Sequence, residues 1–91
     1  MFIDLIEVDT SGQRYQLREV VVNTDAILSI SEEAPTQKMI KESANMGMSP
    51  QASYSRIVMN SSYGGDRFKL VVGTPESIKL KIGNRKRLLR G

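Results

Sequence analysis

The sequence predicts a mainly β fold, a β-rich α+β domain with about five short antiparallel strands, in two hairpins plus one strand, and a short C-terminal helix. Three observations support this prediction. Branched and aromatic residues alternate with polar ones, or form short runs, in five segments. Turn-forming residues separate these segments, and a Thr-Pro pair typical of a helix start follows the last one. With 91 residues, the chain has the size of a single domain.

The first two strands are expected to form an antiparallel hairpin. Residues 2–9 alternate between apolar and acidic side chains with an approximate period of two, which is typical of a strand. Residues 10–13 contain a glycine and form the turn, and strand character resumes over residues 15–22. Because Val20, Val21 and Val22 follow one another without a polar residue, we expect the far end of this strand to be buried on both faces.

The middle of the chain is expected to be irregular. Residues 23–25 favour a turn or a single helical turn, since Asn, Thr and Asp bond to nearby backbone groups, and residues 26–31 form a third strand. Residues 32–53 contain Pro, Gly and many small polar residues, so we predict a long loop there. Within that loop, residues 35–44 could form a short helix with Pro35 at its first position.

A second hairpin and a helix complete the domain. Residues 54–60 and 67–72 have strand character, and the turn between them contains two adjacent glycines. Thr74 and Pro75 then suit the N-cap and first position of a helix. Residues 78–82 alternate as a strand would, but a strand would leave Pro75 unexplained, so a helix is favoured.

We expect this helix to stop at Gly83 and Asn84. The predicted organisation is therefore a β-rich domain over residues 1–83, with the long loop at 32–53, and a basic C-terminal tail over residues 84–91. The basic stretch after Gly83 could instead extend the helix.

The composition excludes most enzyme chemistry. The chain has no cysteine and no histidine, which removes disulfides, Cys/His metal sites and nucleophile systems that need a histidine base. Glu32 and Glu33 form the only adjacent carboxylate pair, and neighbours on an extended segment point to opposite faces. Asp4, Glu7 and Asp9 could contribute oxygen ligands, but no calcium-loop spacing is present. We predict a protein that is not an enzyme and that uses no cofactor or metal.

The charge is concentrated at the C-terminus. The chain carries a formal net charge of +3, yet residues 79–91 hold six bases and no acid, which leaves residues 1–78 with seven bases and ten acids. A basic segment on an acidic body suits either a solvated tail or a surface that docks on an acidic partner.

The predicted function is therefore that of a small regulatory binding module that associates with a protein partner. Methionines in the long loop would supply adaptable apolar contacts, and the C-terminal bases would steer the protein toward an acidic surface. The candidate partner-binding residues are Met39, Ile40, Met46, Met48, Lys79, Lys81, Arg85, Lys86, Arg87 and Arg90.

Two other functions remain open. The same bases could contact the phosphates of a nucleic acid, although no aromatic residue in the basic segment offers a stacking surface. The chain could also be a structural subunit of a larger assembly, and a viral origin would suit an isolated domain of this size. Because so short a chain has a small core, we expect a homo-oligomer. The start of the sequence lacks the features of a secretory signal, and no stretch is apolar enough to span a membrane, so we expect a cytoplasmic protein without membrane contact.

Two stretches of the chain resemble a known family. Residues 23–30, Asn-Thr-Asp-Ala-Ile-Leu-Ser-Ile after a hairpin, and residues 68–78, a strand that runs into Thr-Pro-Glu-Ser-Ile, are similar to the small β-rich FlbD-type flagellar and swarming proteins. The resemblance covers about half of the chain. It implies a short, non-catalytic β domain that binds other macromolecules. Thr24 stands where that family has proline, and residues 32–53 replace a short turn.

Overall fold

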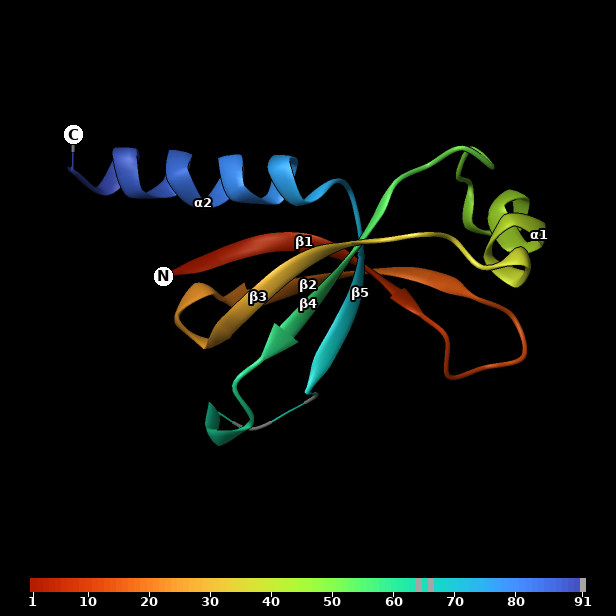
Figure 1. Cartoon of the computed structure of the whole chain (residues 1–91), viewed down its shortest axis with the longest axis horizontal. Helices are drawn as coiled ribbons and strands as arrows, with labels where there is room; N and C mark the ends of the chain where they lie inside the picture. The colour runs from red at the N-terminus through yellow and green to blue at the C-terminus, as the bar shows by residue number, and fades with distance from the viewer. Residues whose placement is uncertain (64, 66, 91) are drawn as a thin grey trace.

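Five antiparallel strands form one open sheet in the order β2-β1-β5-β4-β3, with two helices packed against it (Figure 1). This computed structural model describes residues 1–63, 65 and 67–90, and for residues 63 and 84–90 only the backbone. The strands are β1 (Phe2–Asp9), β2 (Gln16–Asn23), β3 (Ile27–Glu33), β4 (Tyr54–Met59) and β5 (Phe68–Val72). The helices are α1 (Gln37–Met46) and α2 (Pro75–Arg90), with short 3-10 turns η1 (Thr24–Ala26) and η2 (Ser61–Tyr63).

The predicted β-rich fold and both hairpins are confirmed. β1 pairs with β2 over eight residue pairs, from Phe2 with Asn23 to Asp9 with Gln16, and β4 pairs with β5 over five. Residues 23–25 enter a single helical turn, because the Asn23 side chain accepts a hydrogen bond of 3.0 Å from the Asp25 N–H. The two halves of the sheet are joined by one registered pair between β1 and β5, Glu7 with Val71.

The two faces of the sheet carry separate cores. The inner face, which α2 covers, holds a cluster that includes Ile3, Leu5, Ile57, Val71 and, from α2, Ile78. The outer face is covered by α1 at one end only, where Met39 and Met46 pack against Val8 and Tyr54. The remainder of the outer face is open, so Val21 is 66% exposed and the expectation of burial on both faces at the end of β2 is wrong.

The predicted long loop at 32–53 is interrupted by the helix α1, which confirms the short helix that residues 35–44 could form, and β3 extends into the predicted loop to Glu33. Thr36 and not Pro35 begins this helix, since the Thr36 hydroxyl accepts a hydrogen bond of 3.1 Å from the Met39 N–H. Gly47 ends it in the left-handed conformation at φ 70°, with its N–H donated to the Ala44 carbonyl. Because both ends are capped, these ten residues form a helix although most of them are polar.

The helix prediction at Thr74 is confirmed, but the predicted stop at Gly83 is wrong. The Thr74 hydroxyl accepts a hydrogen bond of 3.1 Å from the Ser77 N–H, as an N-cap does. α2 then continues through Gly83 to Arg90, so residues 84–90 belong to the helix and do not form a separate tail. The buried Ser55 hydroxyl donates to the Gly73 carbonyl at 2.7 Å and fixes the start of α2 to β4.

Candidate functional site

The structure buries two of the four apolar residues predicted to contact a partner. Met39 is 3% exposed and Met46 is 8% exposed, because α1 turns both onto the outer face of the sheet. Met48 is partly buried against the same cluster, and only Ile40, at 44%, is largely exposed. Contrary to expectation, Met39 and Met46 are therefore not exposed for partner contact, and they stabilise the docking of α1 instead. A partner contact through Ile40 and Met48 stays a prediction.

The predicted basic residues lie on α2. Lys79 and Lys81 are exposed, and the Lys81 ammonium group donates a hydrogen bond of 3.2 Å to the Asp4 carbonyl on β1. The other predicted partner-binding residues are Arg85, Lys86, Arg87 and Arg90. Their backbone is helical, and their side chains are not among those that the structure describes.

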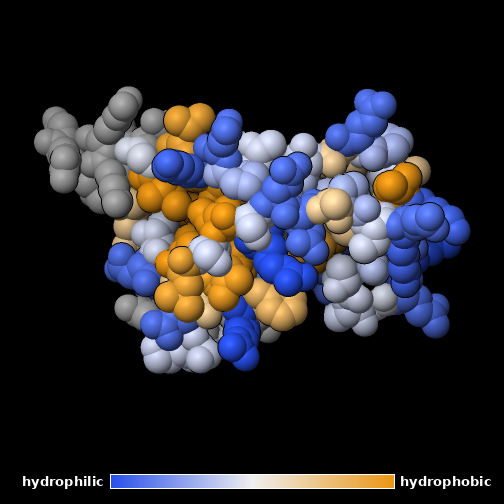
Figure 2. Space-filling view, in the orientation of Figure 1, coloured by the Kyte–Doolittle hydropathy of each residue, from blue (hydrophilic) through white to orange (hydrophobic). Residues whose placement is uncertain are grey.

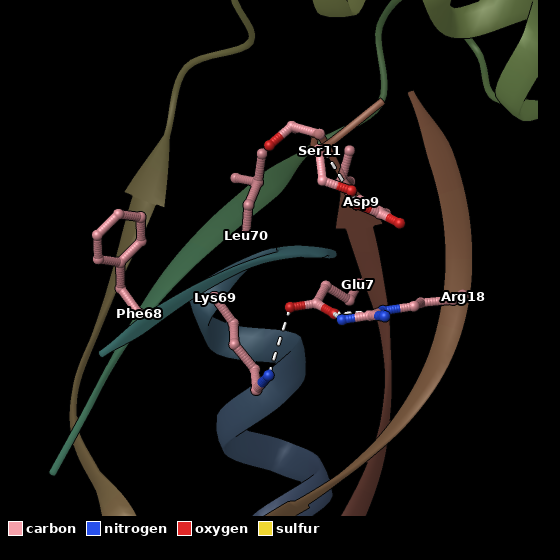
Figure 3. Close-up of a pocket in the computed structure, with 9 residues that line it drawn as sticks. Glu7, Asp9, Ser11, Arg18, Phe68, Lys69 and Leu70 are labelled. Carbon is pink, nitrogen blue, oxygen red and sulfur yellow. Dashed lines mark hydrogen bonds and ion pairs between the residues drawn. The ribbon is translucent and has the colours of Figure 1, made fainter. Parts of the chain in front are cut away.

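A pocket of about 360 Å³ opens where β1 and β5 diverge, with Glu7 at its centre (Figure 3). One Glu7 carboxylate oxygen accepts a hydrogen bond of 2.7 Å from the Arg18 guanidinium, and the other lies 3.4 Å from the Lys69 ammonium group. The Glu7 side chain is only 8% exposed. Because both of its oxygens are engaged by cations, Glu7 is an ion-paired core residue and not a free acid or base.

At the rim of this pocket, Asp9 is held in its ionised form. The Ser11 hydroxyl donates to the Asp9 carboxylate at 2.6 Å and the Ser11 N–H donates to it at 3.0 Å (Figure 3). These bonds lower the pKa of Asp9 below 3.8. Asp4 points to the opposite face of the strand, so the three acids of β1 do not gather, and the described residues hold no cluster of three metal-ligating side chains.

An apolar strip is exposed alongside α2 and β3, which contact each other, and we call it the seam (Figure 2). Ile27 and Ile30 of β3 and Ile82 of α2 are partly buried along it, packed against the inner core. Leu28 follows Ile27 in the chain and is 65% exposed. The pairing of β3 with β4 is irregular between Ile27 and Ser29, which leaves Leu28 out of the ladder.

The two ends of the seam lie near different parts of the chain. α2 runs back along β3 in the opposite direction, so the C-terminal part of α2, with its four further bases, lies at the η1 end of β3 (Figure 1). At the other end Glu32, which is exposed, follows Ile30 on the same face of β3. Glu33 is ion-paired with Arg56 at 3.3 Å. The seam thus has the exposed acid Glu32 at one end, and the helix segment that contains Arg85, Lys86, Arg87 and Arg90 at the other.

Sequence reasoning missed both the Glu7 cluster and the seam. For Glu7 a signal exists: it is in phase with Ile3 and Leu5, and a carboxylate on the core face of a strand must find cations. For Leu28 no such signal exists, because the pattern of residues 26–31 does not show where the strand is irregular.

The comparisons with known proteins give no match: no family model, curated protein or solved structure matches this chain. The resemblance to FlbD-type proteins therefore stays a prediction. Within the part of the chain that the structure describes, neither helix has the length and apolar character needed to cross a membrane.

Proposed function

We propose that the chain is a small non-enzymatic binding module that associates with a protein partner through the seam. The observation that carries this proposal is the exposure of Leu28, which follows Ile27 at the irregularity of β3. Ile27, Ile30 and Ile82 are partly buried where the inner core reaches the surface. Contiguous exposed apolar residues with a polar rim are typical of protein interaction surfaces. A partner that covers the seam would bury these side chains.

The available chemistry supports binding in preference to catalysis. The sequence has neither cysteine nor histidine. Among the described residues Glu7 is the one buried carboxylate, and both of its oxygens are held by Arg18 and Lys69. An acid held in this way is poorly suited to proton transfer, because a general acid or base needs a free position next to the substrate.

The substitution Leu28→Glu tests the proposal. It places a charge in the seam at a solvent-exposed position, so the variant is expected to fold, which circular dichroism would verify. The matched control is Val21→Glu, at an equally exposed apolar position on the outer face of β2. In affinity capture from the native host, the wild type and Val21→Glu are expected to retain the same protein, and Leu28→Glu to lose it. Retention of that protein by Leu28→Glu would contradict the proposal.

The alternative is a nucleic-acid-binding regulator, and one observation favours it: α2 continues unbroken to Arg90, so the bases are carried on one helix. This alternative predicts salt-sensitive binding to duplex oligonucleotides that Leu28→Glu leaves intact. It also predicts that exchanging Arg85, Lys86 and Arg87 for glutamate abolishes binding. Absence of oligonucleotide binding at low salt would exclude it.

A further inference from the structure

We infer that the partner at the seam is a second copy of this chain, related to the first by a two-fold axis through the seam. This inference rests on the proposed function, because it names the occupant of the same surface. In such a dimer each copy contributes the same residues, and an isologous interface must therefore be complementary to itself.

The order of charges along the seam provides this complementarity. Glu32 marks one end of the apolar strip, and the bases of residues 85–90 belong to the helix end at the other. A two-fold rotation about the middle of the strip exchanges the two ends. The acidic end of each copy then faces the basic end of the other, and the apolar residues meet at the centre.

The apolar content of the seam fits the same arrangement. Ile27, Ile30 and Ile82 already pack against the buried inner core, so a second copy would extend that core across the interface. Domains of about this size bury only roughly 60–65% of the surface that the unfolded chain exposes, and association is one way to bury more. Leu28, the most exposed residue of the seam, would then lie close to the two-fold axis.

A second exposed apolar surface among the described residues does not fit a self-complementary contact. On the outer face of the β1–β2 hairpin, Phe2 and Val21 are 54% and 66% exposed. Register places Asp4 opposite Val21 and Glu19 opposite Ile6 on that face, so it carries two acids and no base. Two copies that met there would bring like charges together, which opposes association.

Light scattering and analytical ultracentrifugation of the full chain test this inference. The wild type is expected to show twice the 10.2 kDa mass of one chain, with a dissociation constant that rises with salt concentration. Leu28→Glu is expected to raise that constant by about tenfold or more. Val21→Glu, the control on the hairpin face, is expected to leave it unchanged.

A charge exchange tests the two-fold arrangement itself. Glu32→Lys, and separately the exchange of Arg85, Lys86 and Arg87 for glutamate, are each expected to weaken the dimer. Combined in one chain, they are expected to restore it, because the two ends again carry opposite charges. A combined variant weaker than either parent would overturn the two-fold arrangement.

The outcomes also separate this inference from the proposed function. A wild type that stays monomeric at every concentration, or a Leu28→Glu variant that dimerises like the wild type, overturns the inference. If a monomeric wild type captures a different protein and Leu28→Glu loses it, the proposed function stands and the second copy is excluded as the partner. If Leu28→Glu changes neither measurement, both proposals fail.

Discussion

Glu7 of β1 is ion-paired with one residue on each of the two neighbouring strands, β2 and β5. Arg18 of β2 and Lys69 of β5 approach its two oxygens at 2.7 and 3.4 Å, next to the one registered pair that joins β1 and β5. Glu7→Gln keeps the shape of the side chain but leaves two cations facing a neutral amide. We expect the free energy of unfolding to fall by about 2 kcal/mol, less than for a wholly buried pair because the Arg18 side chain is 56% exposed. Chemical denaturation would measure this change.

The matched control is Glu33→Gln. Glu33 also pairs with an arginine, Arg56, but at 3.3 Å and with both side chains substantially exposed. Exposed pairs contribute little, so we expect a change within about 0.5 kcal/mol. Equal effects of the two substitutions would show that burial does not strengthen the Glu7 contacts.

Asp9 gives a pH-dependent prediction. Because its pKa in the folded chain is lowered below 3.8, folding favours the ionised form. The resulting stabilisation is present above the ordinary pKa and is lost as the pH falls through the folded value. Ser11→Ala removes the larger cause, the hydroxyl hydrogen bond, so the pKa of Asp9 should rise toward 3.8 in an NMR titration. Thr10→Ala serves as the control and should leave the pKa of Asp9 where it is in the wild type.

At the scale of secondary structure, Gly83 in α2 gives a prediction about the stability of the fold. This residue lies inside the helix and is exposed. Apart from its chain neighbours and the nearby helix backbone, no atom of the described residues lies within 4 Å of an added Cβ. Gly83→Ala should therefore stabilise the fold by about 0.5–1 kcal/mol, since glycine costs conformational entropy in a helix. Thermal unfolding followed by circular dichroism would show the gain. A loss of stability would instead indicate a left-handed Gly83 at which the helix ends.

Sequence patterns predicted well those elements whose structure is determined by neighbouring residues in the chain. The alternation in residues 2–9 and the Thr74-Pro75 pair gave β1 and the start of α2, since burial of one face and an N-cap leave a local trace. Gly83 was misread as a stop, because a glycine in sequence does not show the sign of its φ angle. The segment that forms α1 was predicted to be mainly loop, because most of its residues are polar. Its few apolar side chains stabilise the helix only by packing against β1 and β4, which lie far away in the sequence.

The candidate site was less predictable for the same reason. Met39 and Met46 were expected at the surface, whereas tertiary packing places them against Val8 and Tyr54. The seam depends on an irregularity in the pairing of β3 with β4 and on the contact between α2 and β3, and both arise from distant parts of the chain. Long-range contacts of this kind are not encoded in a local pattern.

At the scale of the whole molecule, the two cores should differ in stability. β4 is hydrogen-bonded to strands on both sides and contains the fully buried Ile57, whereas α1 attaches to the outer face mainly through Met39 and Met46. We expect amide hydrogen exchange to be faster in α1 than in β4 under native conditions, because α1 can open without unfolding the sheet. Equal protection in the two elements would show that both cores unfold as one unit.

The short turn η1 joins the two edge strands of the sheet, β2 and β3, through only three residues. At the opposite end, α1 follows β3 and contacts β2 (Figure 1). Each edge is thus obstructed at both ends, and an incoming strand would find only a short run of main-chain groups with which to pair. Fibrillar growth by strand addition is disfavoured in such a molecule, and its associations should have a finite stoichiometry set by side-chain surfaces.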